Sequence, residues 1–476
     1  MAQLGAFADE QWQQEALHGH GRDKDGSGSG GDSNKKARAG LCGVLRERKV
    51  VELARAKRRL VEVPYTATLA HAANALLAGR VSAVTVAAPP GHWIGAGGSM
   101  IVESDPATGA ARKHYIGMVN MLDILTHIAE AGQDDDAAAV VEDGQSAQPA
   151  VDLDRRMSVP VSSVIGHSLE GLTLWTLHPN TSVLDCMETF SKGVHRALVP
   201  LESSAENVVA VELVESAPVY RMLTQMDVVR FLRAHGAELG GVLSRTVRDL
   251  GAASEAVLAV ARRTKVIEAI RTMRAASLTA VPVVDAPVDA HILQDVSRPP
   301  RAASFLLLCW YSSVWLLCLS CVQGRGKKVV ETFSATDLRD CPVAQLRSWL
   351  GTSVTEFKEK VAEYRRDGSK PLDAATGAQA TDDGDIVVDA GPAAAVSNEE
   401  RPPQPRGMVT CSFESTLGEV IEKAAASHVH RLWVVDDGEE ENGVLRGVVS
   451  LTDVLRVVRE AAVGEDREMQ HIVVLE

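Results

Sequence analysis

The sequence predicts an α/β (α+β) fold assembled from four copies of one β-α-β-β-α unit. The first observation is a motif that recurs four times: an apolar strand, a small polar residue, two further residues, an aspartate and an apolar helix. The four aspartates follow one another at intervals of 104, 110 and 116 residues: Asp123, Asp227, Asp337 and Asp453. The second observation is an amphipathic helix and an apolar strand upstream of each motif. Internal repetition at this spacing decides the architecture before any single motif does.

Each element of the unit has its own local signal. The upstream helices show apolar residues at helical spacing, and they cover residues 69–76, 183–190, 266–273 and 417–424. Short apolar strands follow at 83–86, 197–200, 280–284 and 432–435. Thr416 and Glu419 form a capping-box pattern at the start of the fourth helix. The small polar residue of each aspartate motif suits the N-cap of the closing helix, and these residues are Asn120, Thr224, Ser334 and Ser450.

Composition limits the class of protein. The chain has 476 residues, of which 45% are hydrophobic, so it can bury a sizeable core in two to four domains of roughly 100–200 residues. Its net charge is −14 and it has no long basic run, which argues against duplex nucleic acid as a partner. The seven cysteines lack the spacing of a disulfide framework, and no secretory signal opens the chain. We therefore expect a reducing compartment, cytoplasmic and/or nuclear.

The fourth repeat carries the residues that point to a family. It reads His430-Arg-Leu-Trp-Val-Val-Asp436, followed by Gly447-Val-Val-Ser-Leu-Thr-Asp453. A unit that closes in Ser/Thr-x-x-Asp resembles the cystathionine-β-synthase (CBS) domain. Four copies in order resemble the γ subunit of AMP-activated protein kinase and its plant γ-like counterparts. The resemblance implies two Bateman pairs, at 50–234 and 243–458, that form a disc with ligand clefts between repeats.

The expected organisation follows the repeats and the composition of the segments between them. A polar, Gly/Ser-rich start and an Asp/Gly/Ala/Pro-rich stretch are typical of disorder. The expected parts are a disordered tail (1–40), repeat 1 (50–130), repeat 2 (160–235), repeat 3 (243–341), a helix (342–364), a disordered linker (365–406) and repeat 4 (407–460).

An apolar segment interrupts repeat 3. Residues 305–322 are 18 residues without a charge, long enough to be considered as a membrane span. A single crossing would, however, separate the strands 281–284 and 329–333 of one sheet. We interpret 296–323 as a translated intron, because valine codons begin with GT, glutamine can be CAG, and the 28 codons are in frame. Their deletion leaves a polar turn. A real apolar loop and a membrane span remain alternatives, and sequencing the mature transcript would decide.

The resemblance also implies a ligand. In CBS domains the motif aspartate accepts hydrogen bonds from both ribose hydroxyls of an adenine nucleotide, and a carboxylate has the two acceptor oxygens that this requires. The ribose candidates are Asp123, Asp227, Asp337 and Asp453, with Thr224, Ser334 and Ser450. The phosphate candidates are His195, Arg196, His430 and Arg431.

Plainer interpretations stay open for both sets. Ser/Thr-x-x-Asp is close to a capping box, in which the acid only satisfies backbone N–H groups. A surface His-Arg pair can be a solvated patch or an ion pair with the neighbouring repeat. The odd repeats lack the His-Arg pair, and Asn120 replaces Ser or Thr in repeat 1. The sequence thus associates phosphate-type cations only with Asp227 and Asp453.

No catalytic or metal constellation emerges, since Cys318-x-x-Cys321 has no second pair. We expect a non-enzymatic γ-like regulatory subunit with no required cofactor and with AMP, ADP or ATP as regulatory ligands. The implied partners are a catalytic α and a scaffolding β kinase subunit, without nucleic acid or membrane. The alternatives are a stand-alone adenine-nucleotide-binding CBS module that regulates other enzymes, and a single-span membrane protein with CBS domains.

Overall fold

The computed structural model describes residues 41–87, 115–138, 153–165, 174–201, 219–285, 321–339, 341–367, 408–436 and 443–475. The expected tail 1–40, nearly all of the linker 365–406 and residues 296–320 of the interrupting segment lie outside this part of the chain. Within it, no helix is long and apolar enough to cross a membrane.

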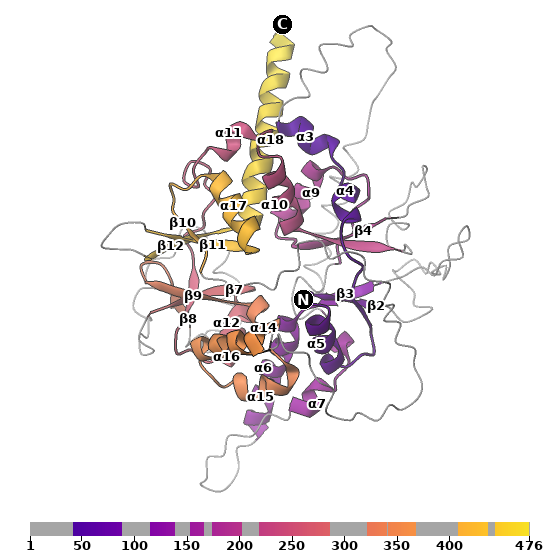
Figure 1. Cartoon of the computed structure of the whole chain (residues 1–476), viewed down its shortest axis with the longest axis vertical. Helices are drawn as coiled ribbons and strands as arrows, with labels where there is room; N and C mark the ends of the chain where they lie inside the picture. The colour runs from indigo at the N-terminus through magenta and orange to yellow at the C-terminus, as the bar shows by residue number, and fades with distance from the viewer. Residues whose placement is uncertain are drawn as a thin grey trace, which may run out of the picture.

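Four small sheets, each with its helices, correspond to the four repeats (Figure 1). Repeat 1 contains β1 (Glu62–Pro64), α5 (Leu69–Ala78), β2 (Val84–Ala87), β3 (Tyr115–Val119) and α6 (Met121–Ala138). Repeat 2 contains α9 (Val183–Ser191), β4 (Arg196–Pro200), β5 (Tyr220–Thr224) and α10 (Gln225–Ala234). Repeat 3 contains β6 (Leu258–Ala261), α12 (Val266–Ala275), β7 (Ala280–Val284), β8 (Cys321–Gln323), β9 (Val329–Ser334) and α14 (Ala335–Arg339). Repeat 4 contains β10 (Thr410–Cys411), α17 (Leu417–Ser427), β11 (Arg431–Val435), β12 (Leu445–Ser450) and α18 (Leu451–Leu475).

The sheets share one topology. In repeats 1, 3 and 4 the first strand pairs in parallel with the second, and in all four repeats the two strands before the closing helix are antiparallel. Repeat 3 adds β8 at its edge, antiparallel to β6. The three residues of β8 are the end of the segment 296–323, so this part of the segment forms an edge strand. The interpretation of 296–323 as a translated intron stays a prediction.

The helices begin where the sequence places their caps. The Thr416 hydroxyl accepts a hydrogen bond from the Glu419 N–H at 3.2 Å, and the Glu419 carboxylate accepts one from the Thr416 N–H at 3.2 Å, which confirms the capping box. Thr68 and Ser182 cap α5 and α9 through the same N3 contact. Each cap satisfies one of the N–H groups that a helix start leaves without a partner.

Short connecting elements tie the repeats together. They are α3 (Leu41–Glu47), α4 (Val50–Arg55), α7 (Leu153–Met157), η2 (Val161–Ser163), α11 (Gly240–Leu243), η5 (Val343–Gln345), α15 (Leu346–Trp349) and α16 (Val354–Asp367). The helical pattern predicted at 342–364 thus falls mainly on two helices, which residues 350–353 separate. Residues 50–55, predicted as the start of repeat 1, pack on repeat 2 instead, with the Val50 N–H donating to the Thr181 carbonyl at 2.9 Å.

Sheets join repeat 1 to repeat 2, and repeat 3 to repeat 4, as the Bateman pairing predicts. The rings of Tyr115 and Tyr220 meet edge to face with centroids 5.8 Å apart. In the other pair, the Trp433 indole N–H donates to the Thr332 hydroxyl at 2.7 Å. These contacts leave the helices on the outer sides of both pairs.

Helix packing joins repeat 2 to repeat 4 and repeat 1 to repeat 3, which the sequence did not predict. One hydrophobic core combines repeats 2 and 4, and a second combines repeats 1 and 3. In Figure 1 the first core, with α9, α10, α17 and α18, fills the upper half of the disc, and the second, with α5, α6, α12 and α14, fills the lower half. On the surface beside the upper core, Arg233 and Glu422 form a bidentate pair between repeats 2 and 4, both bonds at 2.6 Å. The four repeats therefore close into a ring of alternating sheet and helix contacts.

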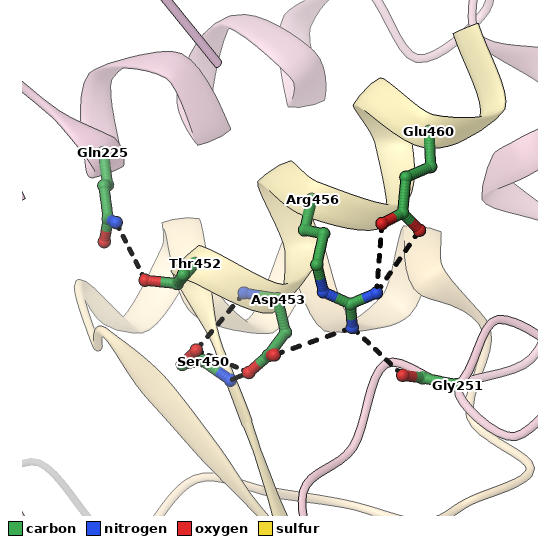
Figure 2. A network of polar contacts seen from close by, with 7 residues as sticks. All are labelled: Gln225, Gly251, Ser450, Thr452, Asp453, Arg456 and Glu460. Atoms are coloured by element: carbon green, nitrogen blue, oxygen red, sulfur yellow. Dashed lines mark hydrogen bonds and ion pairs between the residues drawn. The ribbon is translucent and has the colours of Figure 1, made fainter. Parts of the chain in front are cut away.

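Gln225 is a buried polar link across the upper core (Figure 2). Its side-chain amide nitrogen lies within hydrogen-bond distance of three acceptors, the carbonyls of Phe190 at 3.0 Å and Val194 at 3.1 Å and the Thr452 hydroxyl of repeat 4 at 2.9 Å, which share its two N–H groups. A buried acceptor that loses its donor contributes a desolvation penalty.

The Gln225→Ala variant should therefore unfold with a free energy about 1–3 kcal/mol lower than the wild type. Urea denaturation followed by circular dichroism measures this change. Thr452→Val, which removes one partner and leaves the two backbone carbonyls bonded, should lose less. Equal losses in the two variants would contradict the assignment of the effect to the carbonyls.

Candidate functional site

The repeats meet around a cavity of about 470 Å³. Among the described residues, its lining carries nine arginine and lysine side chains against three carboxylates, although the whole chain has a net charge of −14. The cations are Lys57, Arg58, Arg59, Arg80, Arg196, Arg230, Arg339, Lys358 and Arg431, and the acids are Asp227, Glu331 and Asp337. A concave surface with this excess of positive charge attracts anionic ligands.

Sequence reasoning named only two of these nine cations. Three of them form the run Lys57-Arg58-Arg59, directly after α4. This run was the available signal, but it is short, and only the fold shows that it faces the cavity. One of the others is already paired, since Lys358 forms an ion pair with Glu331 at 2.9 Å.

A common turn directs all four repeats toward the cavity. One or two positions after the upstream helices α5, α9, α12 and α17 stands a residue of positive φ: Arg80 (47°), Gly193 (96°), Ser277 (53°) and His428 (52°). This conformation is unfavourable for residues other than glycine, and such strain concentrates at functional sites. Two positions later stand Ser82, His195, Thr279 and His430, all of which line the cavity.

Gly193 gives a direct test of this turn. No atom lies within 4 Å of a Cβ built at Gly193 or at Gly240, so steric clash affects neither position. Gly193→Ala should lower the free energy of unfolding by about 1 kcal/mol because of its positive φ, whereas Gly240→Ala in α11 should raise it by about 0.5–1 kcal/mol. Thermal unfolding of both variants measures the difference. An unchanged stability of Gly193→Ala would refute the claim that the positive φ at this position is unfavourable for a residue with a Cβ atom.

The two predicted arginines reach across the sheet contacts to the odd repeats. One guanidinium N–H of Arg196 donates to the Ser82 hydroxyl at 3.2 Å. Arg431 makes the equivalent contact, donating to the Thr279 hydroxyl at 2.5 Å and to the Ala280 carbonyl at 3.0 Å. Burial lowers the pKa of Arg431 to about 10. Both partners of Arg431 are neutral, so its charge has no counter-ion among the described residues.

Because its side chain reaches into repeat 3, Arg431 contacts residues near a different motif aspartate from that of its own repeat. The sequence associated Arg431 with Asp453 because both belong to repeat 4, and in the sheet of that repeat Arg431 pairs with Ser450. Its side chain contacts Ala280, whose strand partner is Ser334, the residue that opens the Asp337 motif. The Arg431 guanidinium thus contacts repeat 3 and not only its own repeat. The sequence shows which repeat a residue belongs to, but the direction of a long side chain depends on the neighbouring repeat.

One oxygen of every motif aspartate caps a helix. The backbone N–H groups of the four N-cap residues donate to the Oδ2 atoms at 2.8–3.0 Å, in the pairs Asn120–Asp123, Thr224–Asp227, Ser334–Asp337 and Ser450–Asp453. The carboxylate half of a capping box, in which the acid accepts from the N-cap N–H, is thus present in all four repeats. Because Oδ2 is used by the cap, any further binding by each aspartate depends on the contacts of its second oxygen, Oδ1.

The Oδ1 atoms have different surroundings. Asp227 Oδ1 contacts Lys57 Nζ at 2.7 Å. Asp453 Oδ1 faces Arg456 at 3.7 Å, outside the cavity lining, and Asp123 is buried and also outside it (Figure 2). Asp337 lines the cavity, and no hydrogen bond or ion pair from a described residue reaches its Oδ1.

The structure therefore brings most predicted site residues to one place. His195, Arg196, His430, Arg431, Thr224, Asp227, Ser334 and Asp337 line the cavity, whereas Asp123, Ser450 and Asp453 do not. Over the described part of the chain, no group of histidine, cysteine, aspartate and glutamate residues could hold a metal ion. Cys318 lies outside that part.

Comparison with known proteins agrees with the architecture. The CBS domain family matches residues 405–460. Two Arabidopsis thaliana proteins, the SNF1-related protein kinase regulatory subunits gamma-like PV42a and PV42b, are 47% and 44% identical to the chain. The matches cover 84% and 87% of this chain and 92% and 95% of the relatives. The Bos taurus 5'-AMP-activated protein kinase subunit gamma-3 is 42% identical over 60 residues, which are 13% of this chain and 11% of that protein.

The identity to PV42a and PV42b extends over most of both chains, and the last repeat of this chain matches the CBS domain. The chain belongs to the family of SNF1-related protein kinase regulatory subunit gamma-like proteins.

Proposed function

We propose that this protein is a non-catalytic γ-like regulatory subunit of an SNF1-related/AMP-activated-type Ser/Thr kinase and that it binds an adenine nucleotide in the central cavity. The observation that carries the proposal is the placement of Asp337 and Arg431. Among the described residues, Asp337 Oδ1 has no hydrogen-bond partner and the partly buried Arg431 guanidinium has no counter-ion. The Arg431 guanidinium contacts the carbonyl of Ala280, and the strand partner of Ala280 is Ser334, the N-cap residue of the Asp337 helix.

The chemistry of an adenine nucleotide matches both groups. A ribose diol donates hydrogen bonds, and Asp337 Oδ1 can accept them. A phosphate group supplies the counter-ion that the described residues do not provide for Arg431. Arginine binds phosphate through two parallel N–H bonds. The other cations of the lining supply further charge for the phosphates, and His195, His428 and His430 supply further polar contacts. The sites at Asp123 and Asp453 are not part of the proposed pocket.

The kinase association is supported by the names of the relatives, which are called regulatory subunits. We infer partnership with a catalytic α and a scaffolding β subunit, in a cytoplasmic and/or nuclear compartment. Co-purification from native tissue followed by mass spectrometry tests this inference. Recovery of neither subunit would contradict it, and would favour a stand-alone nucleotide-binding module.

Calorimetry on the full chain tests the ligand. AMP, ADP and ATP are titrated separately, with inorganic pyrophosphate as a probe that lacks ribose and 2'-deoxy-AMP as one that lacks a ribose hydroxyl. The proposal requires that at least one ribonucleotide bind, and that AMP bind more tightly than its 2'-deoxy analogue. Equal affinities for AMP and 2'-deoxy-AMP would refute the assignment of a carboxylate to the ribose.

A further inference from the structure

The second cavity aspartate, Asp227, differs from Asp337 in what its outer oxygen, the Oδ1 atom that does not cap the helix, contacts. Its Oδ2 atom accepts hydrogen bonds from the Thr224 N–H and the Thr224 hydroxyl, both at 2.8 Å. Its Oδ1 atom contacts Lys57 Nζ at 2.7 Å. Only 8% of the Asp227 side chain is exposed, so little room remains for a diol beside the ammonium group.

We propose that Lys57 is a built-in occupant of the repeat 2 ribose subsite, so that the cavity binds one nucleotide at Asp337 rather than two. The proposal rests on the proposed nucleotide function, whose ligand class it shares. An ammonium group supplies the same interaction as a ribose hydroxyl, a donated hydrogen bond, and adds a full positive charge. It is therefore a strong internal competitor for a neutral diol.

The segment that carries Lys57 is anchored for this role. It precedes repeat 1 in sequence but is held by repeat 2, because the Arg221 side chain donates to the Lys57 carbonyl at 2.8 Å. Upstream, the N–H groups of Val50 and Val51 donate to the carbonyls of Thr181 and Pro179 at 2.9 and 3.2 Å. Val50 and Ala54 are part of the core shared by repeats 2 and 4. Lys57 and Asp227 thus lie on two segments that are fixed to each other.

The contrast with Arg431 supports the assignment. Lys57 is paired with a carboxylate, whereas the bonds of Arg431 go to a hydroxyl and a carbonyl, which leaves its charge available to an anion. The cavity therefore contains one aspartate that is neutralised from within and one whose outer oxygen contacts no described residue. This difference makes the two ribose subsites unequal, and it depends on a single lysine.

The test is the number of AMP molecules bound per chain, measured by calorimetry on the full-length wild type and on Lys57→Ala. We expect one AMP for the wild type and two for Lys57→Ala, and one again for the double variant Lys57→Ala/Asp227→Asn. Arg48→Ala is the matched control, because Arg48 lies on the same segment but outside the cavity lining, pairs with Glu52 at 3.2 Å and should leave the number at one. If Lys57→Ala folds poorly, Lys57→Met keeps the aliphatic stem and removes the charge.

The two proposals fail separately. A folded Lys57→Ala or Lys57→Met protein that still binds one AMP overturns the role of Lys57 and leaves the nucleotide function standing. A wild type that binds two AMP molecules, one of them lost in Asp227→Asn, also overturns it. A wild type that binds none, with a Lys57 variant that binds one through Asp227, supports the role of Lys57 and refutes binding at Asp337. Absence of binding in every variant counts against both.

Discussion

Asp337→Asn should weaken the binding of AMP roughly tenfold to a hundredfold, which corresponds to about 1.5–3 kcal/mol for hydrogen bonds to a charged group. Asparagine keeps one carbonyl oxygen, which can replace Oδ2 as acceptor of the Ser334 N–H bond at 2.9 Å. Its amide NH2 then takes the place of Oδ1, so the group that faces the cavity is a hydrogen-bond donor instead of an acceptor. A ribose hydroxyl loses its acceptor while the helix keeps its cap.

Two controls isolate this effect. Asp453→Asn makes the same chemical change at a helix cap outside the cavity and should leave AMP affinity unchanged. Pyrophosphate should bind Asp337→Asn as well as or better than the wild type, because the substitution removes a negative charge from a positively charged cavity. A parallel loss of pyrophosphate affinity would show that the variant disturbs the cavity and not the ribose contact alone.

Phe357→Ala should lower the free energy of unfolding by about 3–5 kcal/mol. The Phe357 ring in α16 is fully buried and meets Phe333 edge to face at 5.9 Å and Trp349 at 6.0 Å. Truncation removes the transfer free energy of the ring, leaves a cavity and deletes two aromatic contacts. Urea denaturation of the variant measures the loss.

Phe357→Leu separates volume from chemistry. Leucine fills most of the space and should cost less than about 1.5 kcal/mol if the core can repack around it. A loss as large as that of Phe357→Ala would show that the aromatic contacts, and not the filled volume, dominate at this position. A negligible loss for Phe357→Ala would contradict the placement of α16 in the core.

The repeat architecture could be predicted because it depends on local patterns. Each motif aspartate lies in the first turn of a helix that follows a strand, since the small polar residue before it is an N-cap and apolar periodicity changes at that point. The pairing of repeat 1 with repeat 2, and of repeat 3 with repeat 4, followed from the family resemblance. These features are encoded within some tens of residues, so sequence is sufficient for them.

The site depended on contacts that no local pattern encodes. Lys57 and Asp227 are 170 residues apart, and Arg431 and Thr279 are 152 residues apart. A sequence shows that Lys57 belongs to a short basic run, but not that this run lies in the cavity. It shows that Arg431 belongs to the same repeat as Asp453, but not that the guanidinium crosses to repeat 3. The motif aspartates look alike in sequence and differ only in what reaches their second oxygen.

The alternation of sheet and helix contacts around the ring has a consequence for biosynthesis. The upper core contains both Leu45 and Ala462, and the lower core contains both Val63 and Val361. A ribosome that has released repeats 1 and 2 has therefore produced two half-cores, each without its partner. Contacts between residues so far apart in sequence form slowly. Until the partner repeats are synthesised, the exposed apolar faces can aggregate or bind chaperones. Completion of the fold should accordingly be a late, largely post-translational event that depends on the arrival of repeat 4.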